Sequence, residues 1–153
     1  MKTNAMRILD QKKVNYLVHD YESSGAISGI EVAKYLNQSQ DKVFKTLVTI
    51  AKSKIYYVFV VPVSQELDLK KAAKAVNEKA VEMIKSKDLL PLTGYVHGGC
   101  SPIGMKKVFT TVIDSSVLKQ ETFCINGGKI GYQVEVSLSE LEKVLRFTIE
   151  DVV

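Results

Sequence analysis

The segment VFKTLVTIAKSKIYYVFVVPV, residues 43–63, contains two apolar runs that are rich in β-branched and aromatic residues. The runs extend from Val43 to Ala51 and from Ile55 to Val63, and the polar sequence Lys52-Ser53-Lys54 separates them. Two such runs joined by a short polar turn are typical of paired antiparallel strands. The sequence therefore predicts a β-hairpin over residues 43–63.

Helices and further strands are predicted on both sides of this hairpin. The helices are expected at 4–13, 28–36 and 69–76, with a short helical turn from Ser86 and a last helix near Ser139. Ser28 with Glu31, and Ser139 with Glu142, have the spacing of capping boxes, and Asp68 is placed to cap the third helix. The other strands are expected at 14–21, 80–84, 109–113, 122–126 and 132–136. Helices scattered among mostly hairpin-linked strands predict an α+β fold with a curved, mixed, mostly antiparallel sheet flanked by helices.

Length and composition limit the class of protein. A chain of 153 residues with 46% hydrophobic and 25% charged residues is typical of one soluble globular domain, which we expect to span residues 1–153. The net charge is +4, and of the 21 basic residues only Arg7 and Arg146 are arginine. Because arginine dominates base readout in DNA grooves, we expect no DNA partner, although phosphate contacts by lysine stay open.

Apolar runs and cysteines indicate the compartment. The N-terminal sequence has no apolar core of signal-peptide length, and the run from Ile55 to Val63 is too short to span a bilayer. We expect a cytoplasmic protein that has no membrane partner and is a monomer. In that compartment Cys100 and Cys124 are expected to be free thiols.

The segment GYVHGGCSPIGMKK, residues 94–107, concentrates four of the nine glycines. Gly98 and Gly99 can adopt positive φ, so successive amides there could bind an oxyanion or a phosphate. Pro102 forces Ser101 into an extended conformation and limits how far such a loop can collapse. The alternative is a plain irregular connection between two elements.

Lys45 places a charge inside an apolar strand pattern. Such a lysine can protect a sheet edge or extend its ammonium to solvent. It can also project a cation into a pocket, where it would bind a phosphate or a developing negative charge.

Four segments together resemble a known family: VFKTLV (43–48), LDLKKAAKAV (67–76), TGYVHGGCSPIGMKK (93–107) and NGGKIGYQVEV (126–136). In order and spacing they are similar to the YbaK/EbsC-type Cys-tRNA(Pro) deacylases, freestanding relatives of the editing domain of bacterial prolyl-tRNA synthetase. The resemblance implies a trans-editing enzyme without cofactor or metal that acts on aminoacylated tRNA(Pro). It also implies a transient complex with prolyl-tRNA synthetase.

The resemblance also implies site residues. Lys45 would lie near the terminal adenosine phosphate or the ester, and Gly98, Gly99 and Ser101 would make backbone contacts around the carbonyl. The expected substrate-binding residues are Tyr21, Phe44, Thr46, Cys100, Pro102 and Gln133. Gln133 stands where some relatives carry an acidic residue, so a role in binding the substrate amino group stays open, and Glu135 is assigned no chemistry. Lys70, Lys71, Lys74, Lys106 and Lys107 could follow a tRNA backbone or form a solvated surface.

In this family the mechanism looks substrate-assisted: the cysteinyl thiol attacks its own ester and leaves a cyclic thiolactone and free tRNA. An intramolecular attack needs only folding of the substrate and stabilisation of the oxyanion, which fits the lack of a recognisable catalytic triad. Ser101 is not favoured as a nucleophile, because the motif lacks a nucleophile elbow.

Several alternatives stay open. Cys100 activated by His97 could be an enzyme nucleophile, although a small apolar filler of the loop is the favoured interpretation. His97, Cys100 and Cys124 lack the paired spacing of a zinc site, so no metal is assigned. The chain could instead deacylate Ala-tRNA(Pro), or be a non-catalytic module that binds tRNA or a synthetase. Lys45 favours the enzyme, because a binding module would not need it.

Overall fold

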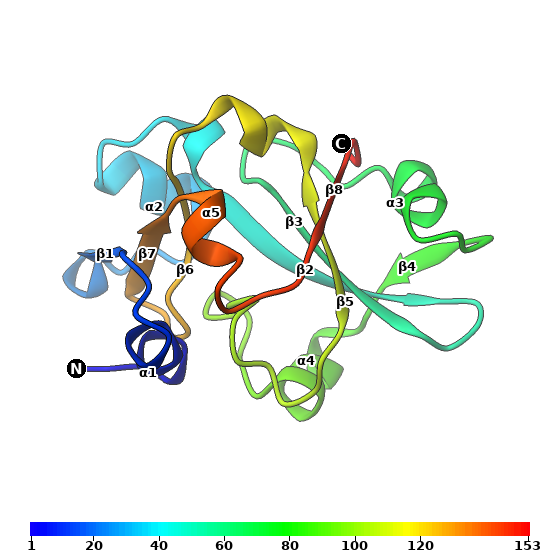
Figure 1. Ribbon diagram of the computed structural model, residues 1–153, viewed down its shortest axis with the longest axis horizontal. Helices are drawn as coiled ribbons and strands as arrows, with labels where there is room; N and C mark the ends of the chain where they lie inside the picture. Colours follow the sequence, from blue (N-terminus) through cyan, green and yellow to red (C-terminus); the bar gives the residue numbers. More distant parts are fainter.

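The computed structural model describes residues 1–153 as two β-sheets with five α-helices around them (Figure 1). The strands are β1 (Leu17–Asp20), β2 (Phe44–Ala51), β3 (Tyr56–Pro62), β4 (Val81–Met83), β5 (Thr110–Asp114), β6 (Phe123–Asn126), β7 (Tyr132–Val136) and β8 (Thr148–Glu150). The helices are α1 (Asn4–Gln11), α2 (Gly29–Tyr35), α3 (Leu69–Ala75), α4 (Ser86–Thr93) and α5 (Leu138–Leu141). None of the helices is long and apolar enough to cross a membrane.

The predicted hairpin is confirmed and forms the centre of the larger sheet. Strands β2 and β3 pair antiparallel from Phe44 opposite Pro62 to Ile50 opposite Tyr56. The larger sheet has the order β4-β2-β3-β5-β8, and β4 pairs only with Thr49 to Ala51 of β2. The first half of β2, which carries Lys45, therefore has no strand of its own sheet on that side.

The mixed, mostly antiparallel α+β architecture is confirmed. Antiparallel pairing also builds the smaller sheet, of order β1-β7-β6, while β3 with β5 and β5 with β8 pair in parallel. A bridge between Val43 and Cys124 connects the two sheets. Strand β8 was not predicted, because three residues are too few to show a detectable alternation.

The predicted caps of α2 and α3 are confirmed, and that of the last helix is corrected. Ser28 and Glu31 form the predicted capping box at α2, and Asp68 caps α3. The last helix starts near Ser139 as predicted, but the predicted capping box of Ser139 with Glu142 was wrong, because Ser137 caps α5 and accepts a hydrogen bond from the Glu140 amide at 3.2 Å. This start places Leu141 in the core, where it is fully buried.

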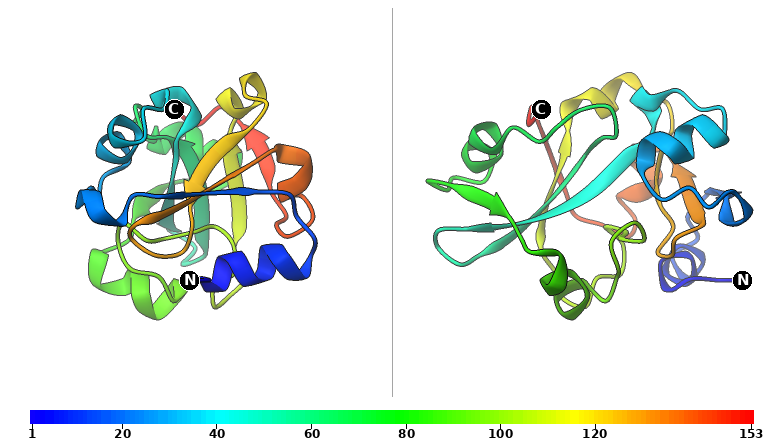
Figure 2. Two further views of the ribbon diagram at one scale, coloured as in Figure 1. Left: turned by 90° about the vertical axis from the view of Figure 1, so that its left-hand side faces the viewer. Right: turned by 180° about the vertical axis from the view of Figure 1, so that it is seen from behind.

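The main hydrophobic core packs the two sheets together. Its members include Phe44, Val48 and Val60 from the larger sheet and Phe123, Ile125 and Val134 from the smaller one. The rings of Phe44 and Phe123 meet edge to face with centroids 5.4 Å apart. Burial of large apolar side chains contributes about 1.5–3 kcal/mol each, so this core holds the start of β2 rigidly. Seen from behind, β2 runs between α2 and α4 (Figure 2).

Candidate active site

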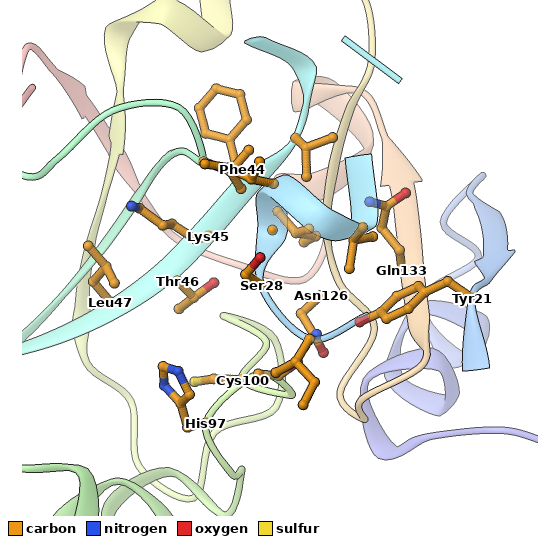
Figure 3. Close-up of a pocket in the computed structure, with 18 of the residues that line it drawn as sticks. Tyr21, Ser28, Phe44, Lys45, Thr46, Leu47, His97, Cys100, Asn126 and Gln133 are labelled. Carbon is orange, nitrogen blue, oxygen red and sulfur yellow. The ribbon is translucent and has the colours of Figure 1, made fainter. Parts of the chain in front are cut away.

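A cleft of about 310 Å³ lies between the start of α2, the first half of β2 and the loop that follows α4 (Figure 3). Its walls include seven of the predicted site residues: Tyr21, Phe44, Lys45, Thr46, Gly98, Cys100 and Gln133. The first half of β2 has no neighbouring strand on the side where β4 pairs with its second half. Four successive residues of β2, from Phe44 to Leu47, therefore border the cleft, although their side chains alternate between the two faces of the strand. The fold thus brings together residues that the sequence separates by more than a hundred positions.

Lys45 provides the cationic group at one side of the cleft, opposite Tyr21 in the close-up (Figure 3). Its side chain is 29% exposed, and its Nζ atom lies 3.9 Å from a carboxylate oxygen of Glu66, which is itself 97% exposed. An ion pair this long and this exposed contributes little, on the order of 0–1 kcal/mol. The ammonium of Lys45 is therefore available to an anionic group of a ligand.

Thr46 provides an unpaired hydroxyl next to Lys45. Its Oγ1 atom is buried and has no hydrogen-bond partner in the protein. A buried polar group without a partner costs about 1–3 kcal/mol. A ligand that bonds this hydroxyl would recover that cost, which makes Thr46 a candidate contact.

The glycine loop differs from the prediction at Gly99. Gly98 has the expected positive φ of 84°, but Gly99 does not, so the predicted positive φ there was wrong. Gly99 is instead required by space, because a Cβ at this position would lie 3.1 Å from the backbone nitrogen of Ile130. The Gly99 amide donates to the Val96 carbonyl at 3.0 Å, whereas the amides of Gly98 and Cys100 make no hydrogen bond within the chain. The free donors of the loop are therefore those of Gly98 and Cys100.

Ser101 and Pro102 do not border the cleft, and neither does Gly99. Both Ser101 and Pro102 are buried. The Ser101 hydroxyl accepts a hydrogen bond from the Ile103 amide at 3.1 Å. These residues support the loop from behind rather than forming its ligand surface.

Cys100 borders the cleft as a protonated thiol. Burial raises its pKa to about 12, and a hydrogen bond with Thr93 only partly opposes that rise. Since the thiolate is the nucleophile, a pKa in this range argues against attack by Cys100. His97 also borders the cleft, but His97, Cys100 and Cys124 do not gather into a cluster that could bind zinc.

Gln133 forms part of the wall without a free polar group. Its side-chain amide exchanges two hydrogen bonds with the amide of Gln38, at 2.7 and 3.1 Å. Position 133 therefore supplies no carboxylate to the cleft. Among the residues that line the cleft, the one acidic side chain is that of Glu66.

Asn126 is a residue of the cleft that the sequence did not reveal. Its Nδ2 atom donates to the Gly98 carbonyl at 2.7 Å, and its Oδ1 atom accepts from the Gly128 amide at 2.7 Å. In the close-up its side chain faces the Tyr21 phenol, whose pKa is raised by burial while Asn126 opposes that rise (Figure 3). The sequence showed only an Asn-Gly-Gly turn, and the contact to Gly98 lies 28 residues away.

The candidate tRNA-binding lysines lie on two parts of the surface. Lys70, Lys71 and Lys74 belong to α3, and Lys71 is bonded to Asp151 at 3.0 Å. Lys106 and Lys107 lie in the loop between α4 and β5. The five lysines therefore belong to two separate segments of the chain, a helix and a loop.

A further polar cluster lies on the smaller sheet, where His19, Cys124 and Glu135 place possible metal-ligand atoms within 4.8 Å of one another. Burial alone would raise the pKa of Glu135, but hydrogen bonds from Lys42, Thr122 and His19 outweigh it and hold the pKa at about 2. Because Lys42 and Thr122 already occupy one oxygen of Glu135 and His19 the other, we assign no metal here.

The class of protein follows from this fold and cleft together with a family match. Residues 26–144 match the family described as the aminoacyl-tRNA editing domain. The match covers most of the chain, and the protein belongs to this family. The family acts on aminoacylated tRNA.

Individual relatives agree with the family. The chain is 44% identical over 137 residues to a protein of Enterococcus faecalis provisionally named Cys-tRNA(Pro)/Cys-tRNA(Cys) deacylase EbsC, covering 89% of this chain and 84% of that protein. A solved structure provisionally described as a trans-editing enzyme for prolyl-tRNA synthetase is 20% identical, with a TM-score of 0.83 and coverage of 99% and 98%. A hypothetical protein of known structure is also 20% identical, with a TM-score of 0.86 and coverage of 95% and 96%. The two structures confirm the editing-domain fold, and the resemblance to the YbaK/EbsC group is confirmed.

Proposed function

We propose that this protein is a trans-editing deacylase that cleaves the ester between cysteine and the 3′ end of tRNA(Pro). The observation that carries the proposal is one cleft that holds the Lys45 ammonium together with the unpaired amides of Gly98 and Cys100. The family membership and the name of the Enterococcus relative support the same substrate class.

The groups of the cleft suit stabilisation of charge rather than nucleophilic attack. Preorganised amide donors lower the energy of an oxyanion at an ester carbonyl, and a nearby cation binds a phosphate or adds to that effect. Gly98 and Cys100 offer the amides, and Lys45 offers the cation. The high pKa of Cys100 leaves the protein without an activated thiol in the cleft.

The nucleophile then comes from the substrate. The cysteinyl sulfur forms a bond to its own carbonyl carbon, the ester C–O bond breaks, and the 3′ oxygen of the tRNA takes up the proton that the thiol loses. The products are a cyclic thiolactone and free tRNA. Held in the correct geometry, such an intramolecular attack gains the advantage of a high effective concentration.

The size of the cleft and the distribution of lysines bear on selectivity. A volume of about 310 Å³ is at the small end of ligand pockets, which favours a small aminoacyl group such as cysteine or alanine. The candidate tRNA-binding lysines are divided between α3 and the loop before β5. Both features support recognition of the aminoacyl end by this chain, with tRNA identity supplied by a transient complex with prolyl-tRNA synthetase.

The test measures deacylation of tRNA(Pro) charged with cysteine and, separately, with alanine, while thiolactone release is followed by mass spectrometry. The variants are Lys45→Ala and Cys100→Ser, with Lys52→Ala as a control that removes an exposed lysine of the β2–β3 turn. We expect thiolactone from the cysteine ester only, a loss of at least about 100-fold with Lys45→Ala, and activity close to wild type for the other two.

Two results would contradict the proposal. Loss of activity with Cys100→Ser would indicate an enzyme thiol as the nucleophile. If neither ester is cleaved while charged tRNA still binds, the chain is a binding module of the same fold.

A further inference from the structure

One peptide unit of the glycine loop is held at both of its ends. The carbonyl of Gly98 accepts the 2.7 Å hydrogen bond from Asn126, and the amide of Gly99, which belongs to the same unit, donates to Val96 at 3.0 Å. The carbonyl and the N–H of a peptide unit point in opposite directions, so these two bonds define its orientation.

This unit is the one in the loop that most needs such support. It lies between two glycines, and rotation of a peptide plane meets least steric resistance where neither neighbour has a Cβ. A rotated unit would turn the Gly98 oxygen toward the Val96 oxygen, where the Gly99 N–H now lies. Two carbonyls would then face each other, and the loop would have to rearrange.

Asn126 is itself well placed to act as a fixed support. Its other side-chain atom is bonded to the Gly128 amide at 2.7 Å, and Asn126 is the last residue of β6. A bond from the turn after β6 therefore transfers the rigidity of the smaller sheet to the glycine loop.

We infer that Asn126 is a positioning residue of the reaction, which holds the peptide between Gly98 and Gly99 so that the amides of Gly98 and Cys100 keep their direction toward the substrate carbonyl. The inference deepens the proposed function and rests on it. Asn126 supplies no proton and no charge; its role in the reaction is to hold the loop, while its side chain also faces Tyr21.

The test uses Asn126→Asp in the full-length protein. Aspartate keeps an acceptor for Gly128 but replaces the donor toward Gly98 with a second acceptor. Thr3→Val is the control for lost stability near the same turn, because it removes the N-cap of α1 and the hydrogen bond to the Gly127 carbonyl but leaves the bond from Asn126 to Gly98 in place. For each variant, kcat and KM for Cys-tRNA(Pro) are measured separately, together with the thermal midpoint and the amide hydrogen exchange rate of Gly99.

We expect Asn126→Asp to lower kcat by about 10-fold to 100-fold with KM within about 3-fold of wild type, as for a misplaced catalytic group. Exchange of the Gly99 amide should become about 10-fold faster, since its bond to Val96 is no longer enforced. Thr3→Val should lower the thermal midpoint while kcat stays within about 2-fold of wild type.

The outcomes separate this inference from the proposed function. Unchanged kcat in folded Asn126→Asp, or an equal loss of kcat in Thr3→Val, would overturn the positioning role. An inactive wild type would refute the proposed function, and the Gly99 exchange rate would then still decide whether Asn126 holds the loop.

Discussion

The ammonium of Lys45 lies 3.9 Å from the carboxylate of Glu66 at the mouth of the cleft. The two side chains come from different segments, since Lys45 is near the start of β2 and Glu66 lies between β3 and α3. Glu66 thus occupies the place at which an anionic group of the substrate would approach Lys45.

Removal of this carboxylate should favour a substrate that carries phosphate. We expect Glu66→Gln to lower KM for Cys-tRNA(Pro) by about 2-fold to 5-fold without changing kcat, which corresponds to an exposed ion pair of under about 1 kcal/mol. Steady-state kinetics at two salt concentrations check this, with the exposed Glu82→Gln on β4 as a control for net charge. A rise in KM would mean that Glu66 binds the substrate ammonium instead.

Two of the six positive-φ glycines, Gly25 and Gly98, allow backbone strain to be distinguished from a role in the site. An alanine at Gly25, where φ is 72°, would contact nothing within 4 Å, whereas at Gly98 its Cβ would lie 2.9 Å from the Ile27 side chain. Each substitution should destabilise the fold by about 1–2 kcal/mol through the left-handed backbone. Denaturant unfolding measures that cost. Only Gly98→Ala should also reduce deacylation, and equal activity in the two variants would contradict the role of Gly98 in the site.

The thiols should react slowly. Burial raises the pKa of both Cys100 and Cys124 to about 12, so very little thiolate exists at pH 8. We expect iodoacetamide to modify neither cysteine of the folded protein within the time that labels the unfolded chain completely. Mass spectrometry of intact protein follows the reaction. Rapid labelling of Cys100 that also abolishes activity would revive the enzyme-thiol mechanism.

Glu135 should make stability depend on acid. Its folded pKa of about 2 is below the ordinary value of 4.5, so its contribution is complete above pH 4.5 and is lost as the pH falls toward 2. Glu135→Gln should therefore be less stable than wild type at pH 7, and the difference in thermal midpoint should shrink between pH 5 and pH 2.5. A difference that stays constant over this range would show that the carboxylate charge contributes nothing.

Much of the fold could be predicted because its signals are local. The β2–β3 hairpin follows from two apolar runs and a polar turn, and the starts of α2 and α3 follow from caps within four residues. The register of α5 needed more than a cap, because Ser137 and Ser139 both precede a glutamate by three positions. Burial of Leu141 decided between them.

The sequence by itself determined which residue types were unusual: a lysine inside an apolar strand and a pair of glycines in a loop. Lys45 and Gly98 could be singled out because each departs from its immediate surroundings. Both were then found on the same cleft.

Only the tertiary structure decided which polar groups are free and which are occupied. The side-chain amide of Gln133 is hydrogen-bonded to that of Gln38. The Gly99 amide donates to the Val96 carbonyl, and the Asn126 side chain donates to the Gly98 carbonyl. The physical reason is that a donor forms a hydrogen bond with an acceptor that the fold brings close to it, however far apart the two residues are in the sequence. Gln38 and Gln133 are 95 residues apart in the chain, so no local pattern can report their pairing.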